Sequence, residues 1–180
     1  MALRVRVKGG GGILRAISEI SRKLRKANYV EVGYYEKSRY PERGTPMPLI
    51  AAIQNFGAPK AAIPPRPFFS KAIWDNKAQW ADILAAYLKL TKYDARKSLN
   101  NLGFVIKGNI QDSIRNTVDP PLAELTLMIR KVVGPNKVPR YKDVIEARMR
   151  LMRGERPTGV SQKPLVWIGM LLNTVDVKVK

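Results

Sequence analysis

The chain of 180 residues contains no cysteine and no histidine. Without cysteine it cannot form disulfides, thiol nucleophiles or Cys-ligated zinc sites, and without histidine it lacks triads and the commonest general acid–base. Acidic residues are also few, 14 against 33 lysines and arginines, and they are spread singly along the chain. A metal-dependent nuclease needs clustered carboxylates, which only folding could gather here. We therefore expect a protein that is not an enzyme and that uses no metal and no cofactor.

Long hydrophobic runs are missing as well. The N-terminus alternates apolar and basic residues, which is unlike a signal peptide, and no apolar stretch approaches the roughly 20 residues of a membrane-spanning helix. Hydrophobic residues nevertheless make up 45% of the chain, enough for a core of ordinary size. These features predict a soluble protein with one domain over residues 1–180, from a reducing compartment or from a particle assembled there.

The formal net charge is +19, and it is concentrated in two blocks. Residues 1–44 and 130–163 each carry a net charge of +7, whereas residues 45–129 carry +4 and residues 164–180 carry +1. Such an excess favours a polyanionic partner, although a solubility role is the simpler alternative. We expect residues 132–163, which are rich in glycine and proline, to form a long mobile basic loop or arm in which residues 141–153 could be helical.

This arm holds the residues that we predict to face DNA: Lys137, Arg140, Lys142, Arg148, Arg150, Arg153 and Arg156. Neutralising phosphates with such side chains releases counterions and gives affinity without reading bases. Tyr141 is the only aromatic residue among them, so stacking on single-stranded bases is weak. The sequence therefore predicts electrostatic, sequence-independent contact with nucleic acid.

Hydrophobic periodicity predicts an α+β fold. The period-two segments indicate a small mixed or antiparallel sheet, and the period-3.6 segments indicate helices. The expected strands are residues 3–8, 29–36, 60–66 and 174–180. The expected helices are residues 13–27, which would cover one face of the sheet, residues 49–56 and 122–131, and a helical hairpin over 70–116.

Arg66 and the aromatic residues each have two interpretations. Arg66 either fixes the proline-rich segment around it by a hydrogen bond to a carboxylate or carbonyl, or it points toward a partner or a lumen. The aromatic residues are most simply core or subunit-interface residues rather than ligand-binding ones, with Phe68 and Phe69 as core anchors. They are Tyr34, Tyr35, Phe68, Phe69, Trp74, Trp80 and Trp167.

The order of several motifs resembles a known family. A strand ending in Val32-Gly33-Tyr34 precedes Ile50-Ala51-Ala52-Ile53-Gln54-Asn55-Phe56-Gly57 and then Ile63-Pro64-Pro65-Arg66-Pro67-Phe68-Phe69. This order is similar to tailed-bacteriophage neck and tail proteins, which are called tail-completion, head–tail joining, minor tail protein Z-like or virion morphogenesis proteins. The likeness continues through Pro120-Pro121-Leu122, Thr126, Arg130-Lys131, Lys163-Pro164-Leu165-Val166, Gly169 and Leu172, and it spans residues 13–180.

The resemblance assigns structural roles to one set of motif residues: Gly33, Phe56, Gly57, Pro64, Pro65, Arg66, Pro67, Phe68, Phe69 and Gly169. It also marks one departure, because such proteins usually carry Asp-Thr before the last glycine, where the aspartate can cap a short helix. Here Trp167 and Ile168 stand at those places. This apolar pair could instead face a neighbouring subunit.

The resemblance implies a structural virion protein that acts without catalysis. Similar proteins form a ring, commonly of six copies, between the head connector or adaptor and the tail tube or tail terminator, and double-stranded DNA passes through it. The implied location is the neck or tail of the virion, with assembly in the host cytoplasm. Two alternatives remain: a non-sequence-specific DNA- or RNA-binding module of nucleoid or ribosome-associated type, and a tail-assembly factor that is absent from the finished particle.

Overall fold

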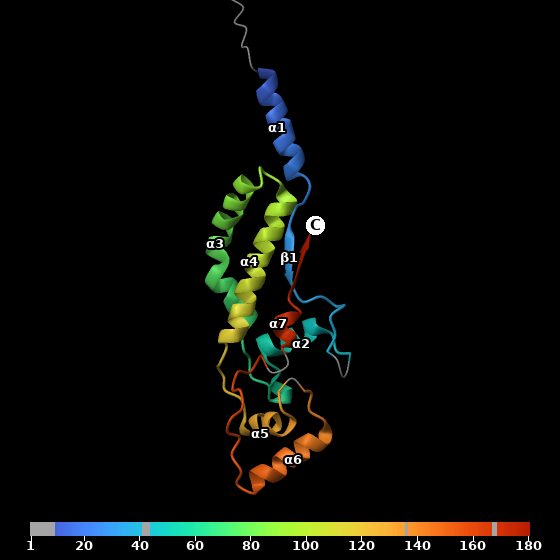
Figure 1. Ribbon diagram of the computed structural model, residues 1–180, viewed down its shortest axis with the longest axis vertical. Helices are drawn as coiled ribbons and strands as arrows, with labels where there is room; N and C mark the ends of the chain where they lie inside the picture. Colours follow the sequence, from blue (N-terminus) through green and yellow to red (C-terminus); the bar gives the residue numbers. More distant parts are fainter. Residues whose placement is uncertain (1–9, 41–43, 136, 167–168) are drawn as a thin grey trace, which may run out of the picture. The chain divides into compact units, whose positions relative to one another are not determined.

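The computed structural model describes residues 10–40, 44–135, 137–166 and 169–180. Helices dominate these residues, and the two strands among them form an antiparallel sheet, so the predicted α+β class is confirmed (Figure 1). The elements follow in the order α1 (Gly10–Leu24), β1 (Val30–Gly33), α2 (Met47–Phe56), the 3₁₀ helix η1 (Pro59–Ala61), α3 (Phe68–Leu90), α4 (Ala95–Asn116), α5 (Glu124–Val133), α6 (Tyr141–Met152), α7 (Met170–Asn173) and β2 (Asp176–Val179).

The chain divides into two compact units. Among the described residues, unit 1 contains residues 10–32, 77–106 and 177–180, and unit 2 contains residues 33–76 and 107–176. None of the helices in the described ranges combines the length and the apolar character needed to cross a bilayer.

Unit 1 contains most of the sheet and the part of α4 that packs on it. The pairing of the two strands extends to residues 29 and 180. There the backbones of Tyr29 and Lys180 exchange two hydrogen bonds, of 3.2 and 3.0 Å. Helix α4 meets the sheet at Gly103, where a Cβ atom would lie 2.3 Å from Val177 Cγ1 and 2.9 Å from Val30 Cγ2. No side chain fits in that gap. Glycine has a low helix propensity, but at this position its missing side chain allows the helix to approach the sheet.

The predicted helical hairpin over 70–116 is confirmed as α3 and α4. In unit 1, its turn is closed by a 2.7 Å hydrogen bond between the hydroxyls of Thr91 and Ser98, and Ser98 is fully buried. In unit 2, the Ser113 hydroxyl donates to the Phe68 carbonyl at 2.7 Å. Hydrogen bonds thus hold the turn to α4 in unit 1 and hold α4 to the start of α3 in unit 2.

Unit 2 contains most of the buried core. Phe68 is 1% exposed and lies edge-on to Tyr34, with 6.4 Å between ring centroids, so the prediction that Phe68 anchors the core is confirmed. The Tyr34 hydroxyl donates to the Leu171 carbonyl at 2.8 Å, and burial raises the pKa of Tyr34. The other large side chains of this unit that are almost inaccessible are Met47, Ile110, Ile114, Met128 and Val175.

The strands are fewer than expected. The predicted strands over 29–36 and 174–180 are confirmed as β1 and β2, whereas the strand predicted over 60–66 is wrong. That segment holds η1 and an extended stretch with only an isolated bridge between Ala58 and Ile63, because prolines lack the N–H groups that a sheet requires. The strand predicted over 3–8 lies outside the described residues.

Helix α1 confirms the helix predicted over 13–27, but the prediction that it covers the sheet is wrong. Its apolar residues Ile13, Leu14 and Ile17 are all more than half exposed. The helices predicted over 49–56 and 122–131 are confirmed as α2 and α5.

Candidate partner and nucleic-acid interface

The basic segment over 132–163 has a folded centre. The helical alternative for residues 141–153 is confirmed as α6, which packs against α5. The Asp143 carboxylate accepts a 2.7 Å hydrogen bond from the Arg140 backbone N–H and so caps the start of α6. Ala147 on α6 and Met128 on α5 are fully buried. Residues 141–152 are therefore helical, as this alternative stated, and the mobility expected for the rest of the basic segment stays a prediction.

A buried arginine on α5 holds the chain that returns from α6. Arg130 is 5% exposed, and its Nη1 donates to the carbonyls of Ser161 and Lys163 at 2.7 and 2.8 Å. Its Nη2 donates to the carbonyl of Pro164 at 3.1 Å. Burial, and secondly the charge of Arg66, lower the pKa of Arg130. A guanidinium satisfies several backbone acceptors at once, which explains why a charged residue is buried here.

A second buried arginine belongs to the proline-rich motif. Arg66, also 5% exposed, donates from Nε and Nη2 to the Pro120 carbonyl at 3.2 and 3.1 Å. A weaker contact of 3.5 Å reaches the Pro121 carbonyl. Burial lowers the pKa of Arg66. The interpretation that Arg66 fixes the proline segment is confirmed, and the acceptors are carbonyls.

The family-motif residues around Arg66 interlock. The Asn55 Oδ1 accepts hydrogen bonds from the backbone N–H groups of Phe69 and Ser70 at 3.0 and 3.2 Å, so it satisfies the first turn of α3. Gly57 has φ of 79°, and a Cβ there would lie 2.9 Å from both Ile63 O and Pro65 N. Only glycine fits this position.

The remaining motif residues have varied surroundings. Phe56 is largely exposed, so it is no part of the core, whereas Phe69 is partly buried. Gly33 lies beside the Phe69 ring, and Gly169 has φ of 67° directly before α7. Trp167 and Ile168, the predicted interface pair, lie outside the described residues. The prolines of the motif, Pro64, Pro65 and Pro67, are exposed.

The structure separates the seven predicted DNA-facing residues into two groups. Arg150 forms ion pairs with Glu146 and Glu155, and Arg156 pairs with Glu124 at 2.6 Å. Lys131 on α5 also reaches Glu155 at 2.9 Å, and its hydrogen bond is the main cause that lowers the pKa of Glu155. Arg156 remains 76% exposed in spite of its ion pair, and the other five predicted residues are also exposed at the surface: Lys137, Arg140, Lys142, Arg148 and Arg153.

Two surface recesses lie along the basic part of α6. One, of about 470 Å³, is lined by Lys137, Arg140 and Lys142 together with three valines and Asp143. The other is lined by three cations, two carboxylates and two apolar side chains, which are Lys142, Arg150, Arg153, Glu146, Glu155, Ile145 and Met149. Lys142 belongs to both recesses. This part of the surface can hold an anionic chain by charge without reading its sequence.

Helix α6 also exposes apolar side chains, none of which belongs to the predicted DNA-facing set. Tyr141 is 82% exposed and Met152 is 85% exposed, and Ile145 and Met149 are each more than two-fifths exposed. Their spacing of three and four residues puts them on one face, which could have been read from the sequence. Because polyanion binding needs no such residues, the face also suits a protein partner with acidic and apolar groups.

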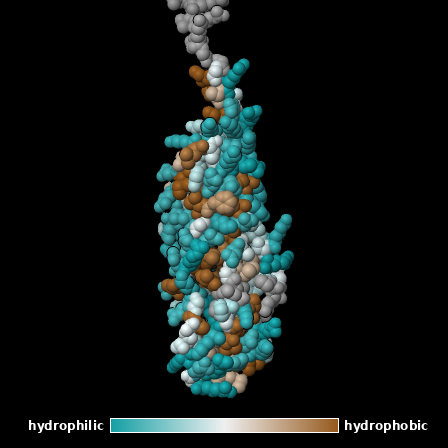
Figure 2. All heavy atoms as spheres, in the orientation of Figure 1, coloured by the Kyte–Doolittle hydropathy of each residue, from teal (hydrophilic) through white to brown (hydrophobic). Residues whose placement is uncertain are grey.

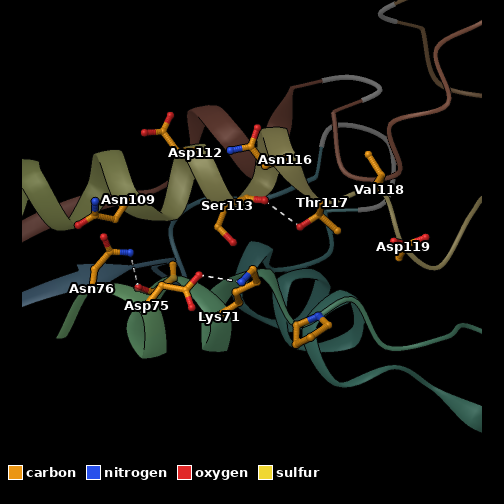
Figure 3. A pocket seen from close by; sticks show the side chains of 12 residues that line it. Lys71, Asp75, Asn76, Asn109, Asp112, Ser113, Asn116, Thr117, Val118 and Asp119 are labelled. Atoms are coloured by element: carbon orange, nitrogen blue, oxygen red, sulfur yellow. Dashed lines mark hydrogen bonds and ion pairs between the residues drawn. The ribbon is translucent and has the colours of Figure 1, made fainter. Parts of the chain in front are cut away.

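Another recess of unit 2 lies where α3 and α4 meet, and its volume is about 500 Å³. Figure 3 shows Asp75 and Lys71 on α3 directed toward each other, at 2.8 Å, and Asp112 and Ser113 on α4. The Thr117 hydroxyl donates to the Ser113 carbonyl at 2.7 Å. Since the Ser113 hydroxyl donates to Phe68, both hydroxyls in the recess are engaged with backbone oxygens. Among the described residues, no group of acidic side chains is arranged to hold a metal ion.

Comparison with known proteins gives no relative: no family model, no curated protein and no solved structure matches this chain.

Proposed function

We propose that this chain is a structural virion protein of a tailed phage, which completes the tail and joins it to the head. In this proposal, copies form a ring, with six as the expected number, through which double-stranded DNA passes. The chain performs no catalysis and has the head connector and the tail tube or terminator as its protein partners.

The observation that supports this function best is the way the motif segments meet. Asn55 caps the helix that begins at Phe68, the Arg66 backbone N–H donates to Gln54 O at 2.8 Å, and the Arg66 side chain donates to the Pro120 carbonyl. Three segments distant in sequence therefore depend on one another for their conformation. Residues that maintain a fold depend on one another in this way. The motif residues therefore support a resemblance to the phage neck and tail proteins in fold, and not in a catalytic centre.

The exposed cations of the basic segment agree with a passage for DNA. They have no described site that would read base edges, and electrostatic contact with phosphates allows a duplex to move. Arg150 and Arg156 contribute less to this contact, because carboxylates neutralise them.

The same exposed cations favour a second candidate, a non-sequence-specific DNA- or RNA-binding module that works as a monomer. Lys142, Arg148 and Arg153 would bind phosphates in either case. The two functions differ in assembly, because only the first requires a closed ring.

Native mass spectrometry and negative-stain microscopy of the purified full chain test the proposal. We expect one dominant closed ring with a central opening, and mass spectrometry of purified phage particles should detect the chain. A chain that stays monomeric and binds free duplex in a salt-sensitive manner would contradict the ring and favour the second candidate. Ring formation without the chain in the particle would indicate an assembly factor.

A further inference from the structure

Helix α1 exposes an apolar stripe, which the described part of the chain leaves uncovered except at the half-buried Ile20. Ile13, Leu14 and Ile17 are 64%, 68% and 57% exposed, and Leu24 is 41% exposed. Apolar residues are visible at the surface along this helix (Figure 2). A helix of 15 residues is marginal in water on its own, so the stripe is expected to be stabilised by packing against something else.

The spacing of the stripe indicates what covers it. Ile13, Ile17, Ile20 and Leu24 follow one another at intervals of four, three and four residues, which is the a/d pattern of a coiled coil. Ile17 and Leu24 take a positions, and Ile13 and Ile20 take d positions. The helix ends at Leu24, and Ala27 beyond it is buried within its own chain, so the stripe open to a partner also ends at Leu24. A narrow stripe of this kind is suited to another helix.

Most of the charged side chains of α1 lie away from the apolar stripe, so two identical helices can pack through their stripes without repulsion. Three charged residues of the helix occupy the outer c and f positions: Arg15, Glu19 and Arg22. The e and g positions beside the stripe hold Leu14, Ala16, Ser21 and Lys23. Lys23, the one charge among these four, already pairs with Glu19 at 2.9 Å. In a chain of net charge +19, two copies of most surfaces would repel each other, but this face carries almost no unbalanced charge.

We infer that α1 is a self-association helix, whose stripe packs against the α1 helices of other copies of this chain. Isoleucine at d positions favours bundles of three or four helices over pairs. Binding to an anionic lipid surface would require cations beside the stripe, where there is almost no unbalanced charge. Binding to a nucleic acid would leave the apolar stripe uncovered. The inference deepens the proposed function, which needs self-association, but it concerns only the means by which copies meet.

Single-cysteine variants test the inference cleanly because the chain has no cysteine of its own. Ile17→Cys places a thiol on the stripe, and Arg22→Cys places one on the outer face of the same helix. Under mild oxidation we expect the stripe variant to form a disulfide-linked dimer at least about tenfold more than the outer variant. If the helices run antiparallel, a mixture of the Ile13→Cys variant and the Leu24→Cys variant should form disulfide-linked dimers between the two variants. This result would also support the inference. Equal linking at positions 17 and 22 would overturn it.

Analytical ultracentrifugation of a charge variant separates this inference from the ring proposal. Ile17→Glu puts charge on the stripe, and Arg15→Glu is the matched control on the outer face. Circular dichroism checks that both variants fold. We expect Ile17→Glu to weaken association by about tenfold or more, while Arg15→Glu leaves it close to that of the parent chain. If Ile17→Glu still forms parental rings, the α1 inference fails and the ring stands. If α1-dependent oligomers form without a closed ring, the inference stands and the ring fails. A parent chain that stays monomeric overturns both.

Discussion

Substitution of alanine for each of two glycines of α4, Gly103 and Gly108, should change the free energy of unfolding in opposite directions. Alanine is more favourable than glycine in a helix interior by about 0.8–1.0 kcal/mol. A Cβ at Gly108 would have no neighbouring heavy atom within 4 Å, so Gly108→Ala should raise the free energy of unfolding by about 1 kcal/mol. At Gly103 the same Cβ would lie 2.3 Å from Val177 Cγ1 and 2.9 Å from Val30 Cγ2.

The magnitude at Gly103 follows from these overlaps. Valine is stiff at χ1, so Val177 cannot simply rotate its methyl groups away, and the helix and sheet must separate slightly. Overpacking of this kind costs about 1–3 kcal/mol, and such close contacts place it in the upper half of that range. After the helix-propensity gain, Gly103→Ala should lower the free energy of unfolding by about 1–2 kcal/mol. The two variants should therefore differ by about 2–3 kcal/mol.

Urea unfolding followed by circular dichroism measures both variants against the parent chain. The double variant Gly103→Ala with Val177→Ala supplies the direct test, since shortening Val177 removes the shortest overlap. We expect a favourable coupling of at least about 1 kcal/mol between the two substitutions. If Gly103→Ala is as stabilising as Gly108→Ala, or if the coupling is absent, then α4 does not approach the sheet through this glycine.

Three further predictions concern the arginines and ion pairs of unit 2. Arg66→Met leaves the Pro120 carbonyl without its charged donor, and it should lower the free energy of unfolding by about 2 kcal/mol in urea denaturation. Arg96→Met on an exposed part of α4 should change it by less than about 0.5 kcal/mol, and equal losses would refute the bonding role of Arg66. Lys131 lowers the pKa of Glu155, so this pair stabilises the fold at neutral pH and stops doing so as the pH falls through that lowered pKa. Lys131→Met should return the Glu155 midpoint toward its ordinary range in an NMR titration, and an unmoved midpoint would contradict the assignment. Exchanging exposed α6 cations for glutamine should lower the salt dependence of duplex binding, in log–log slope, by up to about 3, measured by fluorescence anisotropy. The residues to exchange are Lys142, Arg148 and Arg153. An unchanged slope would place the phosphate contacts elsewhere.

The two buried arginines show how this chain uses part of its positive charge inside the fold. Arg66 and Arg130 both donate to backbone carbonyls of proline-containing segments rather than to carboxylates. Prolines cannot donate hydrogen bonds, so such segments cannot pair with each other, and a multidentate donor is needed to hold them. Net charge therefore overstates the cations that are available to a partner.

Hydrophobic periodicity is sufficient to predict a helix or strand where the pattern is strong and no proline-rich segment opposes it. The hairpin over 70–116, the helix beginning near Ile13 and the strands near Val30 and Val177 were all predictable, because side-chain spacing reports which face is buried. The strand expected over 60–66 failed because the proline content outweighed the apolar residues. The basic segment was expected to be mostly loop, since its few buried residues, such as Ala147, give little apolar signal.

The amino-acid sequence by itself determined the α+β class, the hairpin, the charge excess and the absence of cysteine and histidine chemistry, because these depend on composition and local spacing. Tertiary structure decided which charges are available and which glycines are required. Arg66 and Arg150 look alike in sequence, but one is buried against carbonyls and the other is paired with carboxylates. Gly103 and Gly108 also look alike, and only the position of Val177 distinguishes them. Such differences arise from residues distant in the chain, and spacing along the sequence carries no record of them.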